Sequence, residues 1–298
     1  MRALDPLPNL VDLPRLPIGD WIEAGVDWLQ STFSVVFDAI NGGLQWSVQT
    51  LSELLYFPPP LVVVALLAAL GWWVRSWKFA VFAALGLTLI ITMGLWEAAI
   101  QTLALVLVAS LIALLIAVPV GIVAAENDAV SRTIRPVLDL MQTMPAFVYL
   151  IPAVVFFSLG ETPGVLATMV FAMPPGIRLT ELGIRQVDHE MVEAGEAFGT
   201  SPRKILASIK IPLALPTIMA GVNQVIMLGL SMVVIAGMVG APGLGSKVTE
   251  AVATVNIGGG FEGGLAVVIL AIYLDRVTAS LGERAPVAKA QKRVTAAA

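Results

Sequence analysis

The stretch Ala98–Ala125 reads AAIQTLALVLVASLIALLIAVPVGIVAA and contains no Asp, Glu, Lys or Arg. It is longer than the roughly 20 apolar residues that an α-helix needs to cross a lipid bilayer. An α-helix can cross the hydrocarbon core because its backbone hydrogen bonds are all internal. The stretch therefore predicts a transmembrane helix and places the chain among the all-α membrane proteins.

Six further uncharged runs flank this stretch. Several approach the length of a span, the sixth run of the chain has room for one span plus an outer connection, and the last is short unless its neighbours extend the helix. The chain is 58% hydrophobic and 13% charged, whereas soluble domains are roughly 25% charged. We therefore expect a polytopic membrane protein with about seven spans. The six runs are Leu61–Val74, Phe79–Trp96, Leu140–Leu159, Pro163–Ile177, Ile211–Ser246 and Gly263–Leu274.

The region before these runs has the pattern of surface helices. Apolar residues between Ile18 and Ile40 recur at three- and four-residue spacing, with acids on the other face, which predicts an amphipathic helix. A second, shorter one is expected from Leu44 to Leu55, after Asn41-Gly42-Gly43. The two helices either lie flat at the membrane surface or pack on the spans. The N-terminus lacks the pattern of a cleavable signal peptide, so we expect no cleaved leader.

The positive charges predict the orientation. If the N-terminus is outside and seven spans follow, only Arg2, Arg15 and Lys247 of the 17 lysines and arginines lie outside. Cytoplasmic loops are expected to hold this excess, so the C-terminus is predicted to be cytoplasmic. The absence of cysteine excludes a disulfide framework, a thiol nucleophile and a thiolate metal site. No basic surface suggests a nucleic-acid partner.

The longest inner loop, Arg178 to Lys210, contains clear helix start and stop signals. Asp188 can cap a helix from Glu190 to Phe198, and Gly199 suits its end. Ser201-Pro202 then marks the start of a second helix. Along the first helix, a face of small residues with one aromatic fits a groove on a partner protein. The alternative is a solvated helix that packs on the ends of the spans. The small face comprises Ala194, Ala197 and Phe198, and Glu190, Glu193 and Glu196 mark another side.

This loop is similar to the "EAA" signature of binding-protein-dependent ABC importer permeases. The match consists of Glu193-Ala194-Gly195, then Gly199, then Ile209-Lys210-Ile211-Pro212, at the family's spacing. Gly195 replaces the second Ala of the signature and Ile211 replaces Leu. In that family the loop is a coupling helix that sits in a cleft of a separate ATPase. The resemblance implies an ATPase-coupling set of Glu193, Ala194, Gly195, Ala197, Phe198, Gly199 and Pro212.

Between roughly Ala98 and Arg276 the chain closely resembles the glycine betaine/proline betaine permeases of the ProW type. This resemblance implies a type I ABC importer transmembrane fold in the bacterial plasma (inner) membrane. It also implies a homodimer with a second permease copy, two ATPase subunits, and a substrate-binding protein that delivers a quaternary ammonium osmolyte. The segments that carry the resemblance are Met141–Pro152, Pro174–Thr180, Pro216–Gln224 and Leu230–Ala236.

Four regions are expected along the chain. Residues 1–57 form the N-terminal amphipathic tail, and residues 58–97 form two accessory transmembrane helices. Residues 98–281 form the importer transmembrane core with the coupling loop 178–212, and residues 282–298 form a cytoplasmic tail. No Walker motif is present; the nearest match, Gly240–Lys247, has Ser246 where the motif needs Lys. We therefore expect this chain to bind no cofactor, with ATP and Mg bound by the partner ATPase.

Candidate residues for the translocation pathway are the few polar and soft side chains within the apolar runs. A quaternary ammonium cannot donate a hydrogen bond, so its passage favours aromatic faces and apolar walls. The alternative for each Gln or Asn is a hydrogen bond between helices. The candidates are Gln142, Thr143, Met144, Pro145, Phe147, Tyr149, Asn223, Gln224, Met227 and Ser231.

Other classes of function fit the sequence less well. No catalytic or metal site can be assembled, since nearly every acid lies in a loop or tail, and the single histidine, His189, has no partner ligand nearby. We therefore expect a non-enzyme. An ion-gradient-driven secondary transporter would carry intramembrane charges, and a membrane scaffold would not need the loop helix. Choline, carnitine or a sulfonium osmolyte are alternatives to glycine betaine as the substrate.

Overall fold

The computed structural model describes residues 17–283, and every regular element within that range is a helix. Within this range, residues 17–40 belong to one compact unit and residues 41–283 to another. The tail expected from residue 282 lies almost wholly outside the described residues, as do the first 16 residues of the N-terminal tail.

The two N-terminal helices divide at a different place from the one predicted. Helix α1 spans Ile18–Thr32 and α2 spans Ser34–Tyr56, so Asn41-Gly42-Gly43 lies inside α2 and does not end a helix. Glycine costs a helix roughly 1 kcal/mol relative to alanine, but burial of the apolar side chains that follow outweighs this cost. Leu44, Val48, Leu51 and Leu55 recur at helical spacing and pack on the core of the second unit. This part of the tail therefore packs on the protein's own helices.

Helices α3 (Pro60–Val74) and α4 (Trp77–Thr92) form a hairpin. The Ser76 hydroxyl caps α4 by accepting a hydrogen bond from the Phe79 N–H at 3.4 Å. The helices have 15 and 16 residues, which is fewer than the roughly 20 that a straight span requires. They match the first two predicted runs in position and fall short of a full span in length.

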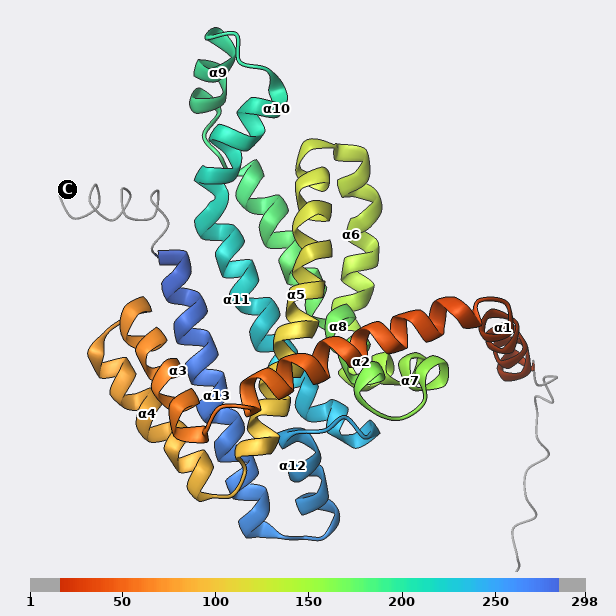
Figure 1. The fold of residues 1–298 in the computed structure, drawn as a ribbon. Coiled ribbons are helices and arrows are strands. Elements are labelled where there is room, and N and C mark those ends of the chain that lie inside the picture. Colours follow the sequence, from red (N-terminus) through yellow and green to blue (C-terminus); the bar gives the residue numbers. More distant parts are fainter. Residues whose placement is uncertain (1–16, 284–298) are drawn as a thin grey trace, which may run out of the picture. The chain divides into compact units, whose positions relative to one another are not determined.

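Three long helices form the centre of the second unit: α5 (Trp96–Glu126), α8 (Glu161–Arg185) and α11 (Ile211–Ala236). They pack side by side over most of their lengths (Figure 1). Gly176 on α8 makes this close packing possible, because a side-chain Cβ there would lie 3.0 Å from both Ala117 of α5 and Val225 of α11. Small residues at helix contacts allow backbones to approach in this way.

Helix α13 spans Ile257–Glu283 and packs against α11 and α12. The short run Gly263–Leu274 is therefore extended at both ends, and the resulting helix is long enough to cross a bilayer. Between α11 and α13 lie a 3-10 turn, Gly237–Val239, and the 10-residue helix α12 (Leu244–Ala253). The sixth run thus contains a single long helix, as predicted.

The predicted span Leu140–Leu159 is not one straight helix. Helix α6 (Asp128–Thr143) and helix α7 (Ala146–Phe157) meet at a bend of 98°. Pro145 has no N–H, and its ring disfavours the helical conformation in the residue before it. Met144 is accordingly extended, with φ −73° and ψ 132°. The fourth run therefore forms a broken pair of helices.

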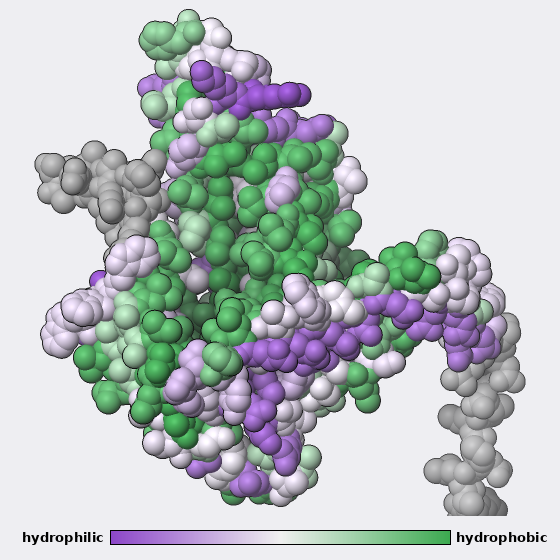
Figure 2. All heavy atoms as spheres, viewed as in Figure 1, coloured by the Kyte–Doolittle hydropathy of each residue, from purple (hydrophilic) through white to green (hydrophobic). Residues whose placement is uncertain are grey.

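Three helical segments within residues 17–283 are each long and apolar enough to cross a bilayer: α5, Pro202–Val239 and Ile257–Gly282. The α6–α7 pair passes the same test only as one bent unit. Polar residues gather at the end of the molecule where α9 (His189–Ala197) and α10 (Pro202–Ile205) lie, and apolar residues cover much of the helical surface next to them (Figure 2).

Candidate functional site

The 178–212 loop contains a short helix with both ends capped. Asp188 accepts a hydrogen bond from the Glu190 N–H at 3.0 Å, which confirms it as the N-cap of α9. At the other end, the Thr200 N–H donates to Gly195 at 3.1 Å and the Gly199 N–H donates to Glu196 at 2.8 Å. Gly199 has φ +71°, a left-handed conformation that glycine adopts without strain. This bonding is the Schellman motif, which ends the helix sharply.

Helix α9 leaves one side free and buries the other. Phe198 is 89% exposed, and Met191, Ala194 and Ala197 are exposed as well. On the opposite side Gly195 is buried, where a Cβ would lie 2.8 Å from the Cδ1 atom of Ile209. The loop therefore packs on itself and presents an apolar surface with one aromatic side chain. Glu193 is exposed beside His189, with 3.6 Å between Oε1 and Nδ1.

The return from the loop to α11 contains a widened helical turn. Ser201 and Pro202 begin α10 as predicted, although the Ser201 side chain makes no capping hydrogen bond. Its backbone carbonyl accepts hydrogen bonds from the N–H groups of Lys204 at 2.9 Å and Ile205 at 3.0 Å. Leu206–Lys210 then form a π-helix, in which the Ile211 N–H donates to the carbonyl of Leu206. Pro212 follows at the start of α11. Its ring crowds the preceding turn, and single π-turns of this kind are frequent at functional sites.

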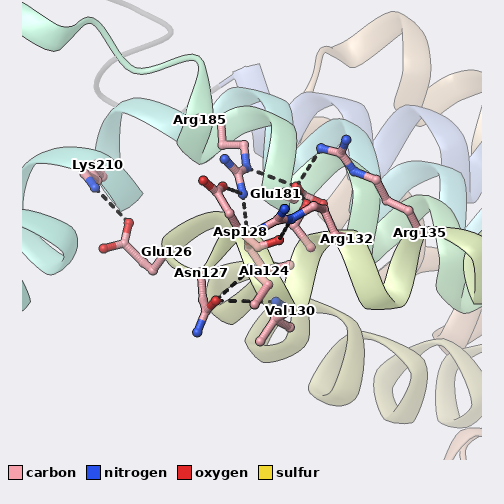
Figure 3. A network of polar contacts seen from close by, with 12 residues as sticks. Ala124, Glu126, Asn127, Asp128, Val130, Arg132, Arg135, Glu181, Arg185 and Lys210 are labelled. Atoms are coloured by element: carbon pink, nitrogen blue, oxygen red, sulfur yellow. Dashed lines mark hydrogen bonds and ion pairs between the residues drawn. The ribbon is translucent and has the colours of Figure 1, made fainter.

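Charged residues connect this loop to the neighbouring helices (Figure 3). Glu181, in the last turns of α8, has a side chain that is only 7% exposed. Its Oε1 accepts hydrogen bonds from Ser131 at 2.6 Å, Arg135 at 3.3 Å and Arg185 at 3.0 Å. Beside it is a cleft of about 430 Å³, and Arg178 on its wall pairs with Asp139. Sequence reasoning missed this network; the four-residue spacing of Glu181 and Arg185 was its only local signal.

The pathway candidates on the fourth run surround the α6–α7 bend. Gln142 and Phe147 are exposed, and Thr143 donates its hydroxyl to the Leu140 carbonyl at 3.0 Å. Tyr149 is buried; its hydroxyl donates to the Met141 carbonyl across the bend. Its ring makes an edge contact with Phe171, with 5.8 Å between centroids. Met144 is half-buried and Pro145 is exposed.

An apolar cleft of about 180 Å³ adjoins this bend, between α7 and α8. Aromatic and small aliphatic side chains form its walls. The lining residues are Tyr149, Pro152, Ala153, Phe156, Leu166, Ala167 and Val170.

The pathway candidates on α11 are of two kinds. Asn223 donates to Asp275 on α13 at 2.9 Å and accepts a hydrogen bond from Thr278, so it links two helices. Gln224 and Ser231 are exposed along α11, with Met227 half-buried between them. Helix α7 also packs against α11, so the two groups of candidates lie on neighbouring helices.

The fold and the loop together define an all-α membrane permease. The family described as "Binding-protein-dependent transport system inner membrane component" matches residues 117–285, and this chain belongs to that family. It is a multi-pass inner-membrane component of a transport system.

Relatives match over nearly the whole chain. The glycine betaine transport system permease protein OpuAB of Bacillus subtilis (strain 168) is 50% identical over 90% of this chain and 95% of its own length. The glycine betaine/carnitine transport permease protein GbuB of Listeria monocytogenes serotype 1/2a (strain 10403S) is 47% identical over 94% and 99%. The glycine betaine/proline betaine transport system permease protein ProW of Escherichia coli (strain K12) is 43% identical over 94% and 78%.

The fold is also similar to that of a solved structure, an inward-facing conformation of the MetNI methionine ABC transporter. The similarity has a TM-score of 0.56 and covers 67% of this chain and 97% of that chain, at 22% sequence identity. At this identity the likeness concerns the fold alone.

Proposed function

We propose that this chain is the permease subunit of an ATP-driven importer for glycine betaine or a related quaternary ammonium osmolyte. Three relatives with 43–50% identity are named as permeases for glycine betaine, alone or with carnitine or proline betaine. The active assembly contains two copies of this chain, two ATPase subunits and a substrate-binding protein. ATP and Mg bind to the ATPase, because this chain contains no Walker motif.

The observation that carries the proposal is the exposed apolar face of α9. Met191, Ala194, Ala197 and Phe198 are exposed together on this helix, and a contiguous exposed apolar patch marks a site of protein–protein contact. The capped ends of α9 hold that face in one orientation. The face docks in a groove of the ATPase through Glu193, Ala194, Ala197, Phe198 and Gly199. Gly195 serves the same coupling from the buried side, where it lets α9 pack closely on Ile209, and Pro212 and the π-helix set the angle at which α11 leaves the loop. Closure of the ATPase dimer then moves the helices as rigid bodies.

The membrane arrangement has seven crossings, with the N-terminus outside and the C-terminus in the cytoplasm. The distribution of Lys and Arg supports this arrangement. Helices α3 and α4 are the accessory spans before the core, and the α6–α7 pair is a broken crossing. A break in the membrane is tolerated where it is buried in protein or lines a cavity, so the bend marks the pathway.

The substrate passes between the bend and the exposed side of α11. A quaternary ammonium is attracted to aromatic faces, and Phe147 and Tyr149 lie just after the bend. On α11 the pathway is lined by polar and polarisable side chains, those of Gln224, Met227 and Ser231. Asn223 contributes by holding α11 to α13 through Asp275 and Thr278.

Reconstitution in liposomes tests the function directly. The permease, the ATPase and the binding protein are assembled together, and uptake of labelled glycine betaine is measured with and without ATP. Uptake is expected only with ATP and all three components. Uptake that a sodium or proton gradient drives without ATP would instead identify a secondary transporter. Competition by unlabelled choline, carnitine and a sulfonium osmolyte ranks the substrates.

A further inference from the structure

The first eight residues of the 178–212 loop, 178–185, belong to helix α8. Ion pairs join both ends of the segment that follows, at Arg185 and Lys210, to the turn between α5 and α6. Arg185 ends α8, where the chain enters the loop, and Lys210 ends the π-helix, where it returns. An Nη2 atom of Arg185 lies 2.7 Å from Asp128 and donates to the Ala124 carbonyl at 2.8 Å. The Nζ atom of Lys210 lies 2.8 Å from Glu126 (Figure 3). Two carboxylates separated by one residue thus contact both ends of the loop.

The turn that carries these carboxylates is itself held in shape. The Asn127 side chain accepts hydrogen bonds from the N–H groups of Ala129 at 2.9 Å and Val130 at 3.4 Å. This cap fixes the start of α6 directly after the end of α5. Glu126 and Asp128 are therefore the last residue of one helix and the first of the next, and a force on either side chain acts on both helices.

Glu181 holds Arg185 in the orientation that reaches the turn. Its buried carboxylate also accepts hydrogen bonds from Ser131 and Arg135, both on α6. Charge-assisted hydrogen bonds to a buried carboxylate are strong, and a carboxylate that lost its donors there would be strongly unfavourable. The guanidinium of Arg185 is consequently held between Glu181 on its own helix and Asp128 on the turn.

We propose that Glu126 and Asp128 are positioning residues that transmit the movement of α9 to α5 and α6. The inference rests on the proposed function, since it is the ATPase that moves α9. One ion pair restricts a single distance and leaves the loop free to swivel, whereas pairs at both ends restrict rotation as well. The loop and the α5–α6 turn therefore move together.

Because these ion pairs reach solvent, their effect on coupled movement can be tested without a large effect on folding stability. The side chains of Lys210 and Glu126 are 24% and 34% exposed, and Asp128 is 74% exposed. Ion pairs that reach solvent contribute little to folding. Variants of Glu126 and Asp128 are thus expected to fold and to assemble with the ATPase, because neither residue belongs to the face of α9 that docks.

The test measures ATP hydrolysed per molecule of glycine betaine imported by the complete complex in liposomes. The variant Glu126→Gln with Asp128→Asn is expected to hydrolyse ATP at close to the native rate and to import about tenfold less, a typical size for a lost coupling. The reversal Glu126→Lys is expected to have a similar effect, and adding Lys210→Glu is expected to restore import. Rescue by the exchange shows that the effect depends on this ion pair. A merely structural role would lower assembly, ATP hydrolysis and import together and would leave the ratio of ATP hydrolysed to glycine betaine imported unchanged.

The matched control is the exposed pair of Lys247 and Glu250 within α12, 3.4 Å apart. The variant Lys247→Gln with Glu250→Gln is expected to keep the native ratio of ATP hydrolysed to glycine betaine imported. Three outcomes would overturn the positioning role alone: unchanged coupling in the variant of Glu126 and Asp128, no recovery of import after the charge exchange, or an equal loss of import in the control. A native complex without ATP-dependent uptake would overturn the proposed function, and this inference with it.

Discussion

Gly199 and Val255 end short helices with the same backbone motif. At each, the N–H of the following residue donates to the carbonyl five residues earlier, from Thr200 to Gly195 at 3.1 Å and from Asn256 to Ala251 at 2.8 Å. Both residues are left-handed, with φ of +71° and +54°. Glycine adopts this conformation freely, but a β-branched residue is strained in it. Position 255 therefore stores strain that position 199 avoids.

Val255→Gly is expected to stabilise the protein by about 1 kcal/mol, because it removes the left-handed strain. Val255 is 80% exposed, so little packing is lost. Thermal unfolding in detergent measures the change as a rise in Tm. Val252→Gly is the control: Val252 is 72% exposed but lies within α12, where glycine weakens the helix. A change of Tm in the same direction in both variants would contradict the assignment of strain to position 255.

Gly199→Val is expected to weaken binding of the ATPase by about tenfold, since a left-handed valine costs roughly 1–2 kcal/mol and loosens the end of α9. No atom lies within 4 Å of a Cβ at this position, so the effect comes from the backbone and not from a clash. Titration of the purified ATPase onto the permease in nanodiscs measures the affinity. Gly199→Asn is the matched variant, because asparagine tolerates this conformation. Equal affinities for the native protein and the valine variant would rule out the effect.

At the scale of elements, the bend between α6 and α7 depends on one proline and one hydroxyl. Pro145 prevents a continuous helix, and the Tyr149 hydroxyl then bonds the Met141 carbonyl that the break leaves without a helical partner. Burying an unpaired carbonyl is unfavourable. The tyrosine therefore has a structural role at the bend as well as the proposed contact with substrate.

Tyr149→Phe separates these two roles, because it keeps the aromatic ring and removes the hydroxyl. We expect a loss of about 1 kcal/mol of stability, the usual value of one hydrogen bond, with the KM for glycine betaine little changed. Tyr149→Leu also removes the ring and is expected to raise the KM. Thermal unfolding and uptake kinetics measure the two effects. A large rise in KM for the phenylalanine variant would assign the hydroxyl to the substrate instead.

Elements with a strong local signal could be predicted from the sequence, and elements set by distant contacts could not. Ala98–Ala125 predicts α5 almost to the residue, and Asp188 and Gly199 predict both ends of α9. The continuity of α2 through Gly42 and Gly43 depends on packing against helices far along the chain. The pairing of Glu181 with Ser131 and Arg135 likewise spans about 50 residues, a separation at which hydropathy and spacing carry no information.

At the scale of the whole molecule, α11 separates the loop helix from α12. It has 26 residues, which corresponds to roughly 39 Å at the helical rise per residue and exceeds the roughly 30 Å of the hydrocarbon core. The turns at Gly199 and Val255 therefore lie beyond opposite ends of a helix that is long enough to cross the membrane. Phe198 and Val255, both highly exposed, are suitable reporters of the two sides.

The chain contains no cysteine, so a single introduced cysteine is a unique label. Phe198→Cys is expected to react with a membrane-impermeant maleimide only in inside-out vesicles, because the excess of Lys and Arg predicts a cytoplasmic location for that end. Val255→Cys is expected to react only from the outside, in intact cells or right-side-out vesicles. Labelling of both positions from one side would mean that α11 does not cross the membrane. Labelling of each from the side opposite to the one expected would invert the proposed orientation while leaving the crossing itself intact.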